Sequence, residues 1–105
     1  MRQVLNYNGR KGPMLPEKEY EEIRRFIIDT FGTQTEVSLK FLMQRALDNE
    51  LVYPNENALW HLLKVKQDLE ARGIIRIRFV GNTPKVQMLR INRKVLKQAD
   101  VVGLP

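Results

Sequence analysis

The sequence contains no cysteine and a single histidine, His61. These absences exclude a disulfide scaffold and thiol chemistry, and they argue strongly against a structural zinc site. No apolar run approaches the length that spans a membrane, and the first residues lack the apolar core of a signal peptide. We therefore expect a cytoplasmic protein with one compact domain, no cofactor and no membrane partner.

Residues suited to catalysis are also scarce. The sequence offers no nucleophile paired with a base, and no glycine loop with the spacing that cradles phosphate. Its densest group of carboxylates consists of Glu17, Glu19, Glu21 and Glu22. They stand at the start of an expected helix, where the positive end of the helix dipole accounts for them. We therefore expect that the protein is not an enzyme.

Basic residues, in contrast, are abundant, with a net charge of +6 and a pI near 9.9. Residues 74–105 contain seven basic side chains against Asp100 alone, and residues 1–15 contain three basic side chains and no acidic one. Residues 16–54 are acidic, and residues 55–73 are balanced. A positive excess confined to the two ends of the chain favours an anionic partner.

A long helical pattern followed directly by a strand dominates the middle of the chain. The apolar stripe of this helix consists of Leu59, Leu62, Val65 and Leu69. Gly73 follows, and glycine suits the left-handed conformation that ends many helices. From Ile75 to Phe79, apolar and basic side chains then alternate, as they do in a half-buried strand. The stretch from Asn55 onward therefore predicts a helix that leads straight into a strand.

The turn Gly81–Pro84 predicts a second strand that pairs with the first. The register that keeps one face apolar pairs Phe79 with Val86, and Ile77 with Met88. It leaves a polar face made of Arg76, Arg78, Lys85 and Gln87. Alternation alone gives this register, and a four-residue connection permits more than one turn geometry.

The segment Asp68–Ile75, a helix end that runs into this basic hairpin, resembles the recognition helix and wing of the winged helix-turn-helix superfamily. The resemblance covers residues 16–92 and implies a small α+β domain with three helices followed by a two-stranded β-hairpin wing. A short third strand could form at Thr35–Val37. The resemblance also implies double-stranded DNA binding, with helix 55–73 in the major groove and hairpin 74–91 on the phosphate backbone.

Two further helices are expected before the long one. The first runs from Pro16 to about Phe31, with a core stripe of Tyr20, Ile23, Ile27 and Phe31. The second spans Leu39–Asp48 after Ser38 as its N-cap. Its apolar face consists of Leu39, Leu42, Met43, Ala46 and Leu47. Residues 49–54 are then the turn of the helix-turn-helix.

The two ends of the chain lie outside these elements. Residues 1–15 are expected to form a flexible basic arm, which either reaches DNA or is a solvated terminus. Residues 93–105 are expected to form a C-terminal tail, in which a short helix from Arg93 to Ala99 could form.

The long helix and the hairpin supply the candidate DNA contacts. Lys64 and Gln67 face away from the core stripe and suit phosphate, guanine or adenine. Asn57 and His61 could also reach base edges. The expected phosphate contacts are Arg76, Arg78, Lys85, Arg10 and Lys11. Alternatively, the charged face of the hairpin only keeps a strand edge from pairing with other chains.

Large side chains off the core stripes suggest a subunit or partner interface. They are Phe26, Phe41, Trp60 and Leu63. One interpretation is a homodimer, most simply built from the first helix and one of the termini. Another is that the helix phases are wrong by one residue, or that the termini cover these side chains. We expect a regulator of transcription or replication, and as an alternative a winged-helix protein-interaction module anchored by Trp60 and Leu63.

Overall fold

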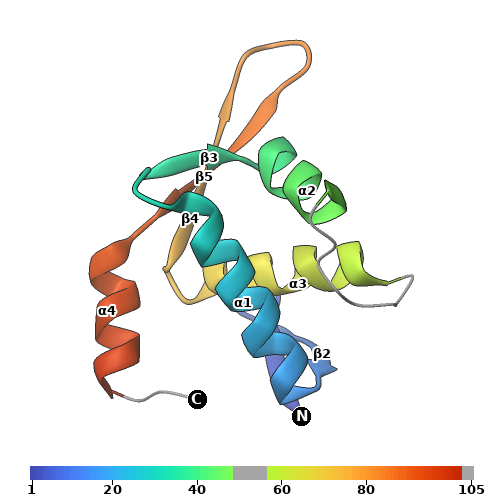
Figure 1. Ribbon diagram of the computed structural model, residues 1–105, viewed down its shortest axis with the longest axis vertical. Coiled ribbons are helices and arrows are strands. Elements are labelled where there is room, and N and C mark those ends of the chain that lie inside the picture. Colours follow the sequence, from blue (N-terminus) through green and yellow to red (C-terminus); the bar gives the residue numbers. More distant parts are fainter. Residues whose placement is uncertain (49–56, 103–105) are drawn as a thin grey trace.

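Helices and short strands follow one another in the order β1–β2–α1–β3–α2–α3–β4–β5–α4 (Figure 1). The computed structural model describes residues 1–48 and 57–102, without the side chains of residues 100–102. The helices are α1 Glu17–Phe31, α2 Leu39–Asp48, α3 Ala58–Ala71 and α4 Arg93–Val102. The strands are β1 Arg2–Leu5, β2 Lys11–Leu15, β3 Glu36–Ser38, β4 Ile75–Val80 and β5 Val86–Ile91.

The strands form two small antiparallel sheets. One sheet consists of β1 and β2, and the other has the strand order β3–β5–β4. The α+β class and the third strand beside the hairpin are therefore confirmed. The described residues contain four helices rather than three, because the short helix expected from Arg93 is present and extends to Val102. The expected turn at residues 49–54 lies outside the described residues.

The helical stripes meet the three-stranded sheet in one core. All four residues of the α1 stripe are at most 1% exposed, and Leu62, Val65 and Leu69 of α3 are fully buried. These stripes are confirmed. On α2 the prediction is wrong for Leu47, which is 60% exposed. Leu47 lies five residues after the buried Leu42, which is about 140° around the helix.

The helix ends follow the capping residues of the sequence. The hydroxyl oxygen of Ser38 accepts the backbone N–H of Phe41 at 3.0 Å, which confirms the cap of α2. Gly32 and Gly73 follow α1 and α3 with φ angles of 54° and 77°, a conformation that glycine adopts without strain. Asn57 precedes α3 but makes no side-chain capping hydrogen bond.

The pairing of β4 with β5 is shifted by one residue from the expected register. Val86 lies opposite Val80 rather than Phe79. Ile77 lies opposite Leu89, and Ile75 opposite Ile91. The expected register would have placed a basic residue, Arg90, opposite the buried Ile75. Burial of apolar pairs at the base of the hairpin therefore decides the register.

Residues 1–15 form an ordered hairpin rather than the expected flexible arm. β1 pairs with β2, and the turn between them is closed by a hydrogen bond from Asn6 N–H to Arg10 C=O at 2.8 Å. Val4 and Leu15 are 1% and 3% exposed and belong to the core. β1 packs against α3. The hairpin is therefore an integral part of the domain.

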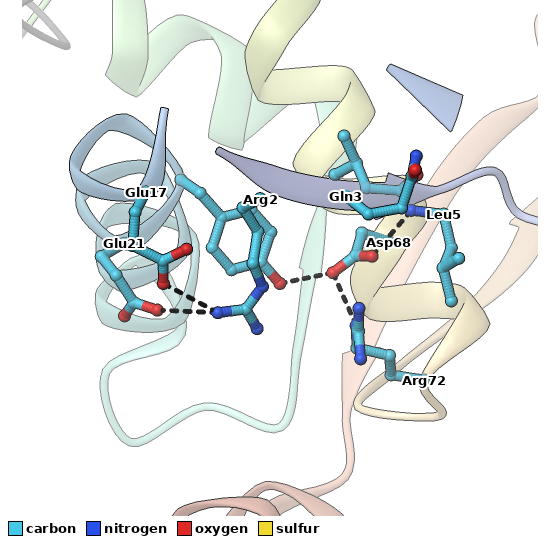
Figure 2. A network of polar contacts seen from close by, with 9 residues as sticks. Arg2, Gln3, Leu5, Glu17, Glu21, Asp68 and Arg72 are labelled. Carbon is cyan, nitrogen blue, oxygen red and sulfur yellow. Dashed lines mark hydrogen bonds and ion pairs between the residues drawn. The ribbon is translucent and has the colours of Figure 1, made fainter. Parts of the chain in front are cut away.

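The carboxylate of Asp68 on α3 joins three elements in the interior. It is fully buried, and one oxygen accepts the backbone N–H of Leu5 in β1 at 2.8 Å (Figure 2). The other oxygen accepts the phenolic O–H of Tyr20 in α1 and the Nε–H of Arg72, the latter at 2.8 Å. Hydrogen bonding to Asp68 raises the pKa of Arg72 above its ordinary value. This carboxylate holds the N-terminal hairpin, α1 and α3 together.

Arg2 continues this network at the surface. Its guanidinium carbon lies 4.3 Å from the centroid of the Tyr20 ring. Its Nη1 atom lies 3.0 Å from Glu17 and 3.4 Å from Glu21, both on α1 (Figure 2). Ion pairs with exposed carboxylates contribute little each. Arg2 nevertheless covers the ring of Tyr20, so the hairpin is attached to α1 outside the core as well as inside it.

Replacing Asp68 with alanine tests the importance of this carboxylate. The substitution leaves the Leu5 N–H and the Tyr20 O–H without their acceptor in a buried site, so we expect the free energy of unfolding to fall by about 3 kcal/mol. The measurement is urea denaturation monitored by circular dichroism. Asp29→Asn, at an exposed position of α1, is the control and should change stability little. A loss for Asp68→Ala no larger than that of the control would contradict the role given to Asp68.

The buried position of Tyr20 predicts that the stability of the protein falls at alkaline pH. Burial, followed by the hydrogen bond to Asp68, raises the pKa of Tyr20 above its ordinary value of 10.0. Above pH 10 the unfolded chain releases this proton while the folded chain retains it, so the stability contribution present below pH 10 is lost as pH rises.

The Tyr20→Phe variant should therefore lose less stability than the wild type between about pH 8 and about pH 11. Urea denaturation at both pH values measures this difference. Tyr7→Phe is the matched control, because Tyr7 is 69% exposed. An equal loss in the wild type and in Tyr20→Phe would show that Tyr20 does not cause the alkaline decline.

Candidate nucleic-acid interface

The outer surface of α3 carries the residues that the helical projection places away from the core. None of them is buried: Trp60, Leu63, Lys64, Gln67 and Ala71. The Nζ atom of Lys64 lies 5.3 Å from the centroid of the Trp60 ring. Asn57 is exposed at the start of the helix. Lys64, Gln67 and Asn57 therefore share one surface, and Trp60 lies within it.

His61 lies on a different side of α3 from Lys64 and Gln67. Its Nδ1 atom contacts the carboxylate of Glu19 on α1, and both side chains are largely covered. The His61 ring also lies against Trp60, with ring centroids 5.4 Å apart. His61 is therefore engaged in packing α3 against α1, and the structure does not place it with the outward-facing polar residues.

A buried lysine fixes the other flank of α3. Lys66 is 5% exposed, and its Nζ donates to Gln87 Oε1 of β5 at 2.9 Å. The same atom forms an ion pair with Glu70 Oε2 at 3.0 Å. Gln87 was expected on the polar face of the hairpin. The shifted register instead turns it toward α3.

The outer face of the three-stranded sheet carries a row of charges. Glu36 of β3 lies opposite Arg90 of β5, and Arg90 lies opposite Arg76 of β4. Arg78 reaches across β5 to Glu36 with two hydrogen bonds of 2.7 and 2.6 Å. Hydrogen bonding from Arg78, strengthened by the nearby charges of Arg78 and Arg90, lowers the pKa of Glu36. Arg78 is thus partly neutralised.

Arg90 was not among the expected contacts, although it stands in the same row as Arg76. Assigning it to that row requires the pairing of β4 with β5, which alternation placed one residue away. Lys85 lies at the exposed turn of this hairpin. β3 pairs only with residues 88–90 of β5, so the hairpin projects beyond β3, as Figure 1 shows.

The basic residues of the N-terminal hairpin lie elsewhere. Arg10 and Lys11 are exposed, in the turn and at the start of β2. This hairpin lies at the opposite end of the long axis of the molecule from the tip of β4–β5 (Figure 1). The structure therefore does not bring Arg10 and Lys11 together with Arg76, Arg78 and Lys85.

The candidate interface residues differ in exposure. Phe26 is half-buried against the core, and the guanidinium carbon of Arg45 lies 4.8 Å from its ring centroid. Leu63 is half-buried. Phe41 of α2 and Trp60 of α3 are 52% and 48% exposed. Of the four candidate interface residues, the two that are exposed thus lie on α2 and α3, not on α1.

The described residues offer no candidate metal site and no candidate membrane span. Within them, histidine and carboxylate side chains form no group of three or more that could hold a metal ion. No helix in the described part of the chain is long and apolar enough to cross a membrane.

Comparison with known proteins gives one finding. No curated protein and no solved structure matches the chain. A family model described as a family of unknown function, DUF6958, matches residues 1–87. The match begins with the N-terminal hairpin, includes Asp68 and all its partners, and ends within β5. Because it covers most of the sequence, this chain belongs to the DUF6958 family.

Proposed function

We propose that this chain is a winged helix-turn-helix domain that binds double-stranded DNA and regulates transcription or replication. In this proposal α3 enters the major groove and the β4–β5 hairpin contacts the phosphate backbone. The order α1–β3–α2–α3–β4–β5, with β3 beside β5, supports it because the resemblance of the sequence to winged helices implies this organisation.

The observation that carries the proposal is the unneutralised positive charge of the hairpin. Residues 75–91 include four basic side chains and no acidic one: Arg76, Arg78, Lys85 and Arg90. Of these four, only Arg78 forms an ion pair with a described side chain, that of Glu36. Exposed cations on a projecting hairpin suit phosphate groups, whose neutralisation dominates the affinity of proteins for DNA.

The outer surface of α3 has the chemistry for a smaller contribution. Lys64 suits phosphate or guanine, Gln67 suits adenine, and Asn57 is exposed at the start of the helix. His61 contacts Glu19, so we assign it no base contact. Because α3 has as many acidic as basic side chains, the hairpin would supply most of the phosphate contacts.

A salt titration of binding to a mixed-sequence duplex tests the proposal. Fluorescence anisotropy should show affinity that falls steeply with salt. In the double variant Arg76→Ala, Arg78→Ala, the slope should be shallower by about 0.9 for each lost phosphate contact. Arg25→Ala, at an exposed position of α1, removes one cation elsewhere and should leave the slope nearly unchanged. Absence of binding at low salt would disprove the proposal.

The ion pair between Glu36 and Arg78 gives a gain-of-function variant. Glu36→Gln removes the carboxylate that neutralises Arg78. We expect tighter binding to the duplex and a slope steeper by about 0.9 if Arg78 then gains a phosphate contact. Asp29→Asn makes the same charge change at an exposed site on α1 and should have less effect. Equal effects of the two variants would mean that net charge alone drives binding.

The exposed aromatic side chains support a second candidate function, protein interaction. Phe41 and Trp60 are large apolar residues left about half exposed, and aromatic residues are enriched among those that dominate interface energetics. A second copy of the chain is the simplest partner, which makes a homodimer part of this proposal.

Sedimentation equilibrium tests the dimer. The wild type should sediment as a dimer, and both Phe41→Ala and Trp60→Ala should shift the equilibrium toward monomer because each removes apolar contact area. Urea denaturation measures the effect of each substitution on folding separately. The loss in free energy of unfolding should be smaller than that caused by Asp68→Ala. A wild type that is monomeric at every concentration would exclude this dimer.

A further inference from the structure

A cavity lies where the base of the three-stranded sheet meets the start of α4. Its lining residues are Thr35, Arg76, Arg90, Ile91, Asn92 and Arg93. The volume is about 520 Å³, and the cavity is open to solvent. Three of the six lining residues are arginines and none is acidic. A hollow lined by one sign of charge attracts ions of the opposite sign.

Two of these arginines carry like charges on neighbouring strands. Arg76 and Arg90 are direct cross-strand neighbours, and like charges in this position destabilise a sheet. The nearest carboxylate in the row, Glu36, accepts both hydrogen bonds from Arg78. Among the described side chains, Arg76 and Arg90 form no ion pair of their own. An anion bound between them would relieve the repulsion.

The third arginine is held in place by the backbone. The Nη2 atom of Arg93 donates to the carbonyl oxygens of Gly32 and Gln34 at 3.1 and 2.6 Å. Carbonyl groups position the guanidinium without cancelling its full charge. Beside it, the side-chain oxygen of Asn92 accepts the N–H of Val95 at 3.1 Å and caps α4. The wall of the cavity formed by α4 is therefore fixed and positive.

We infer that this cavity binds a phosphate group, carried by a phosphomonoester or present as the free ion. The planar guanidinium groups of Arg76 and Arg90 can each donate two parallel hydrogen bonds to phosphate oxygens. The volume exceeds what one phosphate group fills, so it leaves room for the molecule that carries the group. The inference shares Arg76 and Arg90 with the proposed DNA binding, but it concerns the cavity at the base of the sheet, so binding of inorganic phosphate tests it separately.

Isothermal titration calorimetry with inorganic phosphate tests the site, with chloride added to keep the ionic strength constant. The wild type should bind phosphate, and Arg76→Gln and Arg90→Gln should each weaken binding about tenfold or more, since each removes charge-assisted hydrogen bonds. Arg25→Gln on α1 removes the same charge outside the cavity and should leave the affinity unchanged. All three substituted positions are exposed, so folding should be retained.

A second pair of probes identifies the source of the phosphate. Two short DNA duplexes of the same sequence are prepared, one with phosphorylated 5′ ends and the other with hydroxyl 5′ ends. Tighter binding of the phosphorylated duplex, lost in Arg90→Gln, would assign the site to a nucleic-acid end. If the protein binds inorganic phosphate and has equal affinity for both duplexes, the site would be assigned to a small phosphorylated molecule. Either result supports the inference.

The inference is overturned if neither inorganic phosphate nor the phosphorylated end contributes to binding, or if Arg25→Gln weakens binding as much as Arg76→Gln and Arg90→Gln. Failure of the DNA proposal would look different. In that case the hydroxyl-ended duplex would not bind at low salt, whatever the outcome with inorganic phosphate.

Discussion

The structure depends on one buried carboxylate, that of Asp68. A buried carboxylate requires hydrogen-bond donors, and here they come from β1, from α1 and from Arg72, which directly follows α3. If the N-terminal hairpin separated from α3, the carboxylate would lose the N–H of Leu5 as a donor. It would then be either buried with one hydrogen bond fewer or exposed to solvent together with part of the core. The hairpin is therefore fixed by the same interaction that fixes α3 against α1.

The second flank of α3 is fixed by Lys66, whose ammonium group is buried against β5. With Asp68 on one flank and Lys66 on the other, the helix cannot rotate without burying an unpaired charge. The orientation of Lys64 and Gln67 toward the outside thus follows from contacts that these two residues do not make themselves. In this domain, internal polar contacts determine which side chains are available to a partner.

Local patterns in the sequence were sufficient to locate α1, α2 and α3. The stripe of α1 and the caps at Ser38 and Gly73 depend on neighbours within a few residues, and each is present in the structure. The register of β4 and β5 was not predictable in the same way, because it is decided by the burial of Leu89 and Ile91 against other elements. The alternation of side chains within the hairpin instead favoured a register one residue away from the observed one.

Contacts between distant parts of the chain could not be predicted from the sequence either. The partners of Asp68 in β1 and α1 lie 63 and 48 residues away, and nothing near Leu5 or Tyr20 indicates them. The same holds for His61, whose polarity suggested an outward position but whose partner is Glu19. For the candidate site, Arg76, Arg78 and Lys85 were identified from charge alone, whereas Arg90 and Arg93 required the register and the position of α4.

The two proposals concern different parts of one charged surface. Lys85 lies on the part of the hairpin that projects beyond β3, where a cation can approach a phosphate backbone from outside. Arg90 and Arg93 lie at the base, in a cavity whose walls limit what can enter. Arg76 and Arg90 belong to both descriptions. Because like charges on neighbouring strands destabilise a sheet, binding of phosphate at the base would also stabilise the sheet from which the hairpin projects.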